Sequence, residues 1–260
     1  MFLVMNKEKI YAYLVSIVMV VFLFFVATTF YTDKESVAVS ATNQKLLPIY
    51  RVRTEEKKVA LTMNCAWNAD DIDNILNTLE ANQVKITFFM VGDWIEKFPE
   101  AVQKIYQAGH EIASHSDTHP HVNNLSYDKN IEEIEKSNDK IEKVTGSRTK
   151  IYRAPYGEYN NTVIQAAQDK GYQVIQWSLD TLDYTGLTGE EMWKRLDGKL
   201  KAGDIILMHN GTKHTADSLD MLLKNIKAKG LDVVKVSDLI YQENAQIDAN
   251  GEQYQVDSRK

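Results

Sequence analysis

The chain has 260 residues, of which 44% are hydrophobic and 25% charged, and its formal net charge is −6. An acidic balance of this kind does not favour nucleic acid as a partner. Cys65 is the only cysteine, so no intrachain disulfide can form, and the length is enough for one domain with a sizeable core.

The stretch from Ile10 to Thr32 contains no charged residue and is long enough to cross the hydrocarbon core of a bilayer. Lys7 and Lys9 precede it, which predicts a cytoplasmic N-terminus and a domain on the outer face of the cell membrane. We therefore expect a cytoplasmic stub and a single-pass transmembrane helix over residues 1–32. A cleaved signal peptide, with a cleavage site at residues 38–40, is the alternative.

Three further segments follow from composition. Residues 33–57 are polar and predict a juxtamembrane linker, and residues 243–260 predict a disordered polar tail. Between them, residues 58–242 alternate short apolar runs with amphipathic helical patterns, which predicts parallel strands connected by helices. The predicted strands are Lys58–Met63, Lys85–Val91, His110–Ala113, Lys150–Arg153, Tyr172–Trp177, Asp204–Met208 and Leu231–Val236.

Seven such units favour a closed or nearly closed barrel over an open doubly wound sheet. The fold class expected is therefore α/β, a distorted (β/α)7 barrel. The residues that follow the predicted strands support this choice, because Asn64, His115, Arg153, Asp180 and His209 all fall at carboxyl ends. In a barrel these ends converge on one mouth, where such enzymes place their chemistry.

His115 and His119 are four residues apart, a spacing that lets two imidazoles bind one metal ion. The ligand type favours zinc among divalent metals. An exposed pair that binds nothing is the alternative explanation of the spacing.

Four ordered motifs within roughly residues 57–241 resemble the polysaccharide deacetylases of carbohydrate esterase family 4, the NodB-homology domain. The residues around the motifs are most similar to those of the sporulation-associated branch of that family. The motifs are His115-Ser116-x-x-His119, Arg153-Ala154-Pro155-Tyr156-Gly157, Asp180-Thr181-Leu182-Asp183-Tyr184 and Leu207-Met208-His209.

The resemblance implies metal-assisted hydrolysis of N-acetyl groups on peptidoglycan or a related cell-wall glycan of a bacterium, at the cell membrane or in the spore envelope. It implies that His115 and His119 hold the metal. His209 would protonate the departing amine, and an acidic partner such as Asp180 would fix the ring of His209. We therefore expect His209 to be hydrogen-bonded to Asp180 or Asp183.

For three further residues the resemblance also implies roles. Arg153 would support the base, the Tyr156 backbone N–H would stabilise the oxyanion, and Leu207 would line the acetyl pocket. Leu207 is equally explained as barrel filling and Asp183 as a loop cap. Three histidines have structural or surface explanations, namely His110, His121 and His214.

The chain departs from the family in its first motif, where Thr62-Met63-Asn64-Cys65 replaces a Thr-Phe-Asp-Asp string. Asn64 stands at the position of the catalytic base, and an amide cannot accept a proton at useful pH. Cys65 stands at the position of a metal ligand, and either its thiolate completes a His₂Cys site or its side chain is a small buried apolar group. Asp70 and Asp71 could restore a carboxylate, or they cap the following helix.

Three functions therefore stay open: a membrane-anchored N-deacetylase, a catalytically degenerate glycan-binding or scaffold protein, and a metal amidohydrolase of another acylated substrate. The first is the expectation, with activity reduced by Asn64. Because a buried guanidinium without a counter-charge is costly, Arg153 should pair with another carboxylate. The candidate partners are Asp183, Asp70 and Asp71.

Overall fold

The computed structural model describes residues 45–256, together with Lys7, Tyr11 and a helical segment over residues 15–25. It divides into two compact units, Met1–Lys45 and Leu46–Lys260. Among the residues described, no helix has the length and apolar character needed to span a membrane. Much of the predicted anchor, and all of residues 26–44 with the candidate cleavage site, lie outside the described residues.

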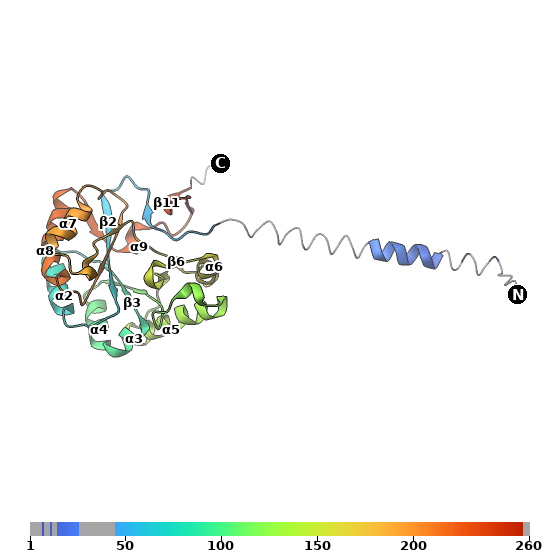
Figure 1. The fold of residues 1–260 in the computed structure, drawn as a ribbon, viewed down its shortest axis with the longest axis horizontal. Coiled ribbons are helices and arrows are strands. Elements are labelled where there is room, and N and C mark those ends of the chain that lie inside the picture. The colour runs from blue at the N-terminus through green and yellow to red at the C-terminus, as the bar shows by residue number, and fades with distance from the viewer. Residues whose placement is uncertain (1–6, 8–10, 12–14, 26–44, 257–260) are drawn as a thin grey trace. The chain divides into compact units, whose positions relative to one another are not determined.

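The second unit is built on a parallel sheet with the strand order β6-β5-β4-β3-β2-β8-β7, and β9 pairs with the start of β2 (Figure 1). The strands of such a sheet have continuously apolar sequences because helices cover them. The strands are β2 (Lys58–Cys65), β3 (Thr87–Met90), β4 (Glu111–Ser114), β5 (Ile151–Tyr152), β6 (Gln173–Val174), β7 (Leu179–Asp180), β8 (Ile205–His209) and β9 (Asp232–Val234).

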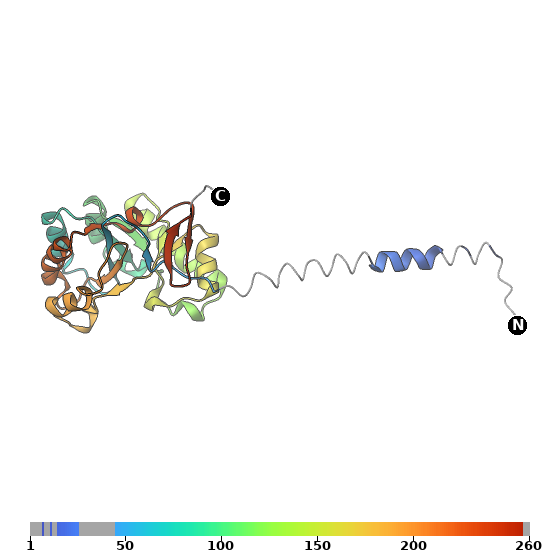
Figure 2. The same ribbon diagram turned by 90° about the horizontal axis from the view of Figure 1, so that it is seen from above.

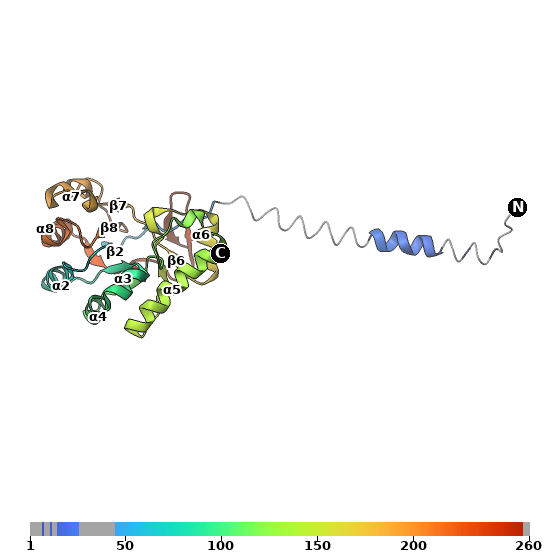
Figure 3. The same cartoon turned by 60° about the horizontal axis from the view of Figure 1, so that its bottom comes forward.

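The larger helices follow one another along the outer side of the curved sheet, in the order α7, α8, α2, α4 and α5 (Figure 3). Helix α7 begins with a capping box formed by Thr188 and Glu191. The helices are α2 (Ile72–Ala81), α3 (Gly92–Lys97), α4 (Pro99–Gln107), α5 (Tyr127–Thr145), α6 (Asn161–Asp169), α7 (Gly189–Leu196), α8 (Thr215–Ala228) and α9 (Val236–Leu239), with short 3-10 turns η1 (Val122–Asn124), η2 (Pro155–Gly157) and η3 (Asp183–Thr185).

The sheet is a parallel half-barrel, so the prediction of a closed or nearly closed seven-unit barrel was correct only in part. Its edge strands β6 and β7 do not pair with each other in the described part of the chain. Only residues 175–178 connect them, which is too short for a helical crossover. Ile49 forms a parallel bridge with Ile175 at this edge instead.

The predictions for the linker and the tail were wrong where the structure describes them. The second compact unit begins at Leu46, and Ile49 and Val52 are buried in it. Residues Ala245–Ile247 (β10) and Glu252–Gln255 (β11) form a hairpin that pairs with β1 (Arg51–Val52) (Figure 2, dark red). Main-chain pairing needs little apolar content, so composition alone suggested disorder.

Alternation along β2 decides which side chains reach the site. Leu61, Met63 and Cys65 belong to the cluster packed against the outer helices, whereas Ala60 packs with Phe89 on the inner face. Successive strand residues point to opposite faces. Asn64 therefore lies on the inner face, and Cys65 does not.

Candidate active site

A pocket of about 450 Å³ lies where the strands end, as the polar residues at these positions predicted. The carboxyl ends of β2, β7 and β8 and the segments after β2, β4, β5, β6 and β7 contribute to it. Its lining residues are Asn64, Ala66, Trp67, His115, His119, Tyr156, Gly157, Trp177, Asp180, Tyr184, Leu207 and His209.

Three residues at the floor of the pocket form a closed ring of hydrogen bonds. Arg153 Nη1 donates to Asn64 Oδ1 at 2.9 Å, and Asn64 Nδ2 lies 3.2 Å from His115 Nε2. His115 Nδ1 lies 2.8 Å from the Arg153 carbonyl oxygen. The ring therefore begins and ends on Arg153.

The donors in this ring are fixed by elimination. Arginine can only donate and a carbonyl can only accept, so Asn64 directs its NH₂ at His115 and His115 carries its proton on Nδ1. His115 Nε2 then accepts from Asn64. Burial, followed by the neighbouring His119, holds the pKa of His115 well below its usual value, which agrees with a neutral ring.

Arg153 is fully buried, yet its hydrogen-bond partners are all uncharged. They are Thr62 Oγ1, Asn64 Oδ1 and the carbonyl oxygens of Ile175 and Gln176. Burial lowers the pKa of Arg153 to about 9.

The prediction that Arg153 pairs with Asp183, Asp70 or Asp71 was therefore wrong. The ring face of Phe89, 3.8 Å from the guanidinium carbon, and more distantly that of Trp177 provide a second kind of contact. Cation–π contact stabilises a desolvated guanidinium without a carboxylate.

His115 and His119 lie side by side at the pocket, with ring centroids 5.0 Å apart and planes at 75°. Burial lowers the pKa of His119 as well, so both rings favour the neutral form that a metal requires. His119 adopts a left-handed backbone with φ of 57°, an uncommon conformation outside glycine. Tyr156 has the same feature with φ of 59°.

Cys65 does not join the two histidines. Its side chain is fully buried in the cluster under the outer helices and is absent from the pocket lining. Burial, followed by the charge of Asp71, raises the pKa of the thiol well above its usual value. The prediction of a Cys65 ligand was therefore wrong, and the small buried apolar group is the correct description.

The donor set does not fit a site with three protein ligands. Two neutral imidazoles are present, but within the described residues no group of three or more His, Cys, Asp or Glu side chains could hold a metal ion. The lone pair of His115 Nε2 already accepts a hydrogen bond from the side-chain NH₂ of Asn64. A catalytic zinc site normally has three protein ligands and one open position.

His209, at the end of β8, is hydrogen-bonded through Nδ1 to Asp183 Oδ1 at 2.9 Å. Asp183 is fully buried and also accepts from the His209 and Tyr184 backbone N–H groups and from Thr215 Oγ1. These contacts fix the ring and leave Nε2 available at the pocket.

A hydrogen bond from His209 to Asp180 or Asp183 was predicted, and it is made to Asp183 and not to Asp180. Asp180 lines the pocket and accepts from the Leu182 backbone N–H at 2.7 Å. Burial raises its pKa. The signal for Asp183 was present in the sequence as the second aspartate of the Asp180-Thr181-Leu182-Asp183 motif.

Neither Asp70 nor Asp71 lines the pocket, so neither replaces the missing base. Asp71 precedes α2 but makes no side-chain cap. Its carboxylate accepts from the Gly211 backbone N–H at 2.7 Å and from Asn210 Nδ2 at 3.3 Å, which connects the loop after β2 to the loop after β8.

Tyr156 and Leu207 lie at the pocket as predicted, but three aromatic residues of its wall were missed. These are Trp67, Trp177 and Tyr184. Tyr184 ends the Asp180–Tyr184 motif and could have been named from it, whereas Trp67 and Trp177 are lone aromatic residues in loops and carry no periodic signal.

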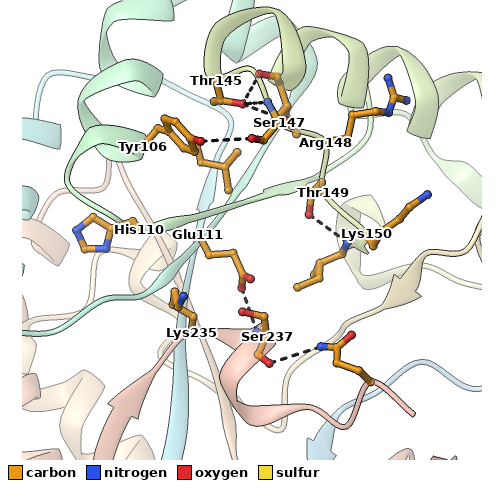
Figure 4. Close-up of a pocket in the computed structure, with 14 residues that line it drawn as sticks. Tyr106, His110, Glu111, Thr145, Ser147, Arg148, Thr149, Lys150, Lys235 and Ser237 are labelled. Carbon is orange, nitrogen blue, oxygen red and sulfur yellow. Dashed lines mark hydrogen bonds between the residues drawn. The ribbon is translucent and has the colours of Figure 1, made fainter.

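A second cavity of about 450 Å³ lies near the amino end of β4 and contains His110 in its lining (Figure 4). Its side chains bond to one another, as Tyr106 does with Ser147 and Glu111 with the Ser237 N–H. His110 Nδ1 accepts from the Ile86 N–H at 3.1 Å. The structural explanation of His110 therefore fits its contacts.

Comparison with known proteins agrees with this geometry. The family model for polysaccharide deacetylases matches residues 51–175. An uncharacterized protein, YlxY of Bacillus subtilis, is 34% identical over 74% of this chain and 60% of its own length. A peptidoglycan-N-acetylglucosamine deacetylase of Bacillus cereus is 30% identical over 66% of this chain and 64% of its own.

Among solved structures, a pseudoenzyme of carbohydrate esterase family 4 from Bacillus anthracis superposes with a TM-score of 0.72 at 30% identity, over 81% of this chain and 70% of that one. The parallel half-barrel and the pocket at its strand ends define the class as a polysaccharide deacetylase fold. The chain belongs to carbohydrate esterase family 4. It spans just under two thirds of the two curated relatives described above.

Proposed function

We propose that this chain binds N-acetylated sugar residues of peptidoglycan, or of a related cell-wall glycan, and deacetylates them slowly at most. The observation that carries the proposal is the amide of Asn64, which is hydrogen-bonded on both sides, to Arg153 and to His115. Family membership and the names of the curated relatives support the glycan as ligand.

The reason for slow turnover is chemical. An amide at the position of the general base cannot take a proton from water at useful pH, and a positioned base contributes roughly 10²–10⁴ in rate. Any zinc held by His115 and His119 would be bound weakly, because the Asn64 amide competes for the same lone pair. Glycan binding, in contrast, needs only the pocket.

An active deacetylase is the second candidate, and the His209–Asp183 pair favours it. An imidazole with a fixed tautomer is suited to protonate a departing amine. The Tyr156 N–H and the Leu207 wall would assist by holding the acetyl group. A mutant of the B. anthracis pseudoenzyme has restored enzymatic activity, which shows that a chain of this family can lose turnover while keeping a restorable site.

Localisation belongs to the same proposal. The uncharged stretch before Asp33 supports a retained anchor with the half-barrel domain on the outer face of the cell membrane. The residues around the four motifs support a role in sporulation. Fractionation of cells that express the full chain tests the anchor, since a cleaved signal peptide would release the barrel unit in soluble form.

Two assays on one preparation test the proposed activity. Calorimetric titration with N-acetylglucosamine oligomers should show saturable binding, while acetate release over the same time should stay near background. Oligomers of glucosamine, which lack the acetyl group, are the control ligand and should bind more weakly. Absence of binding to any N-acetylated oligomer would reject the proposal, and rapid acetate release would favour the second candidate.

A further inference from the structure

We propose that Glu133 of α5 is a positioning residue of the pocket. It holds residues 116–118, the turn between His115 and His119, in the conformation that places the His119 ring at the pocket. Glu133 lies outside the four motifs and is not among the residues that line the pocket. The effect expected on ligand binding rests on the proposed function, whereas the effect on the turn can be measured without a ligand.

The carboxylate of Glu133 accepts four hydrogen bonds, and all of them come from this turn. Its Oε2 accepts from Ser116 Oγ at 3.1 Å and from the backbone N–H groups of Asp117 at 3.0 Å and Thr118 at 2.9 Å. Its Oε1 accepts from Thr118 Oγ1 at 3.0 Å. Hydrogen bonds to an ionised acceptor are roughly twice as strong as those between neutral groups. One side chain thus binds every residue between the two histidines.

The charge of Glu133 is directed at the turn and not at a surface lysine. In the described part of the chain Glu133 belongs to no ion pair, whereas the adjacent Glu132 pairs with Lys129 and Lys136. Successive residues of a helix project about 100° apart, so the two glutamates of α5 face different surroundings. Glu132 therefore offers a natural comparison for Glu133.

The turn requires support because two backbone positions are unfavourable. Ser116 within it has φ of 70°, and His119 directly after it has φ of 57°. Such left-handed conformations persist in residues other than glycine only where the surroundings determine them. In the described part of the chain the His119 ring has edge-on contacts with the His115 and Tyr156 rings but no hydrogen bond to another residue. The position of the His119 ring therefore depends on the backbone of the turn.

The carbonyl groups of the turn are held from the opposite side by α3, which packs against α5 (Figure 3). The Gly92 N–H donates to the Ser116 carbonyl at 2.9 Å, and the next N–H of α3 donates to the Asp117 carbonyl at 2.9 Å. A Cβ on residue 92 would collide with Asp117 Oδ1, so the approach needs a glycine. Lys140 Nζ, two helical turns after Glu133, lies 2.7 Å from Asp117 Oδ1. Helix α3 supplies donors to the turn, and Glu133 supplies the acceptors.

Loss of Glu133 should therefore displace the His119 ring. Without this carboxylate the Asp117 and Thr118 N–H groups lose their protein acceptor, and the left-handed positions lose part of what determines them. The ring would move away from Tyr156, and the shape of the pocket would change with it. Affinity for an N-acetylated sugar should fall as a result.

The first test measures the turn in the full chain without a ligand. Glu133→Ala should speed hydrogen exchange of the Asp117 and Thr118 amides by at least about tenfold. It should also shift the ring-proton resonances of His119, which lie beside the Tyr156 ring. Glu133→Gln keeps one oxygen for the two N–H groups and presents its NH₂ to Thr118 Oγ1, so it should restore most of the wild-type behaviour.

Two controls separate positioning from stability. Glu132→Ala removes the adjacent carboxylate of the same helix, which contacts only lysines. Asn138→Ala destabilises α5 elsewhere, because buried Asn138 bonds to the backbone of Thr149 and not to the turn. Both should leave the two amides and the His119 resonances as in the wild type. The same changes in Asn138→Ala would show a merely structural role and overturn the proposal.

The second test is a calorimetric titration of the same variants with an N-acetylglucosamine tetramer. Glu133→Ala should weaken binding by about tenfold and Glu133→Gln by less than about threefold, while both controls should bind like the wild type. Unchanged binding, or unchanged exchange and His119 resonances, in Glu133→Ala would overturn the positioning role while the proposed function stood. Failure of the wild type to bind the tetramer would instead reject the proposed function, and the exchange and resonance data would still decide the role of Glu133 in the turn.

Discussion

Asn64 connects Arg153 to His115, with its carbonyl oxygen 2.9 Å from the Arg153 guanidinium and its amide nitrogen 3.2 Å from the His115 ring. The amide satisfies both neighbours at once. It accepts from a buried cation and donates to a neutral imidazole, which a carboxylate in the same place could not do. Asn64 is thus integrated into a ring of hydrogen bonds that is complete without a further ligand.

Replacing Arg153 tests how much this ring stabilises the fold. Arg153→Met should lower the free energy of unfolding by about 3 kcal/mol or more, because it leaves buried acceptors unpaired, among them Asn64 Oδ1 and Thr62 Oγ1. Arg148→Met is the contrast, since Arg148 pairs with three carboxylates nearer the surface and should cost about 1 kcal/mol. Urea unfolding measures both, and equal losses would contradict the account.

The His209–Asp183 contact should fix the tautomer of the ring. Nitrogen chemical shifts of His209 should show the proton on Nδ1 in the wild type, since that atom is the one that faces Asp183. Asp183→Ala should abolish this preference and destabilise the fold, because it removes the acceptor of four hydrogen bonds. Asp180→Ala should leave the tautomer in place; a shift caused by Asp180→Ala alone would reverse the assignment.

The folded state should become less stable as the pH is lowered below 6.5. Burial lowers the pKa of His110 from 6.5 to about 4, so below pH 6.5 the unfolded state binds a proton that the folded state does not. The free energy of unfolding therefore decreases as pH falls from 6.5 toward 4. His110→Asn, which keeps an acceptor for the Ile86 N–H, should reduce this slope by about 1.4 kcal/mol per pH unit. His214→Asn serves as the control, and an unchanged slope in His110→Asn would contradict the assignment.

Metal dependence should be weak in the wild-type protein. A ligand that binds only the folded state raises stability in proportion to RT ln(1 + [L]/Kd), so a chelator should barely change the melting temperature if zinc binds weakly. Metal analysis should find less than one zinc per chain, and changing both His115 and His119 to alanine should remove what is present. Stoichiometric zinc that survives dialysis against a chelator would contradict the reading of the donor set.

The sequence was sufficient to predict the residues at the strand ends, because the β/α alternation and the four motifs locate them independently. It could not predict which aspartate reaches His209, since Asp180 and Asp183 are three residues apart and the intervening turn decides between them. Leu182, with φ of 53°, directs that turn.

The sequence also left the environments of Arg153 and Cys65 and the C-terminal hairpin unpredicted, each for a physical reason. Arg153 was expected to need a carboxylate, but carbonyl oxygens and the Phe89 ring face stabilise it instead. The sequence did not decide whether Cys65 is a metal ligand or a core residue. The alternation of side chains along β2 places it under the outer helices, in the core. The hairpin at residues 245–255 is held by backbone pairing that side-chain composition does not reveal.

The most direct test of the account is acetate release from an N-acetylglucosamine oligomer by the wild type and by Asn64→Asp, with metal content measured in both. Asn68→Asp is the matched control, because it adds the same charge to an exposed side chain in the same loop. We expect Asn64→Asp to be at least about tenfold faster than the wild type and Asn68→Asp to be unchanged, since only Asn64 occupies the position of the base. Rapid turnover by the wild type, with no gain in Asn64→Asp, would contradict the claim that Asn64 limits this site.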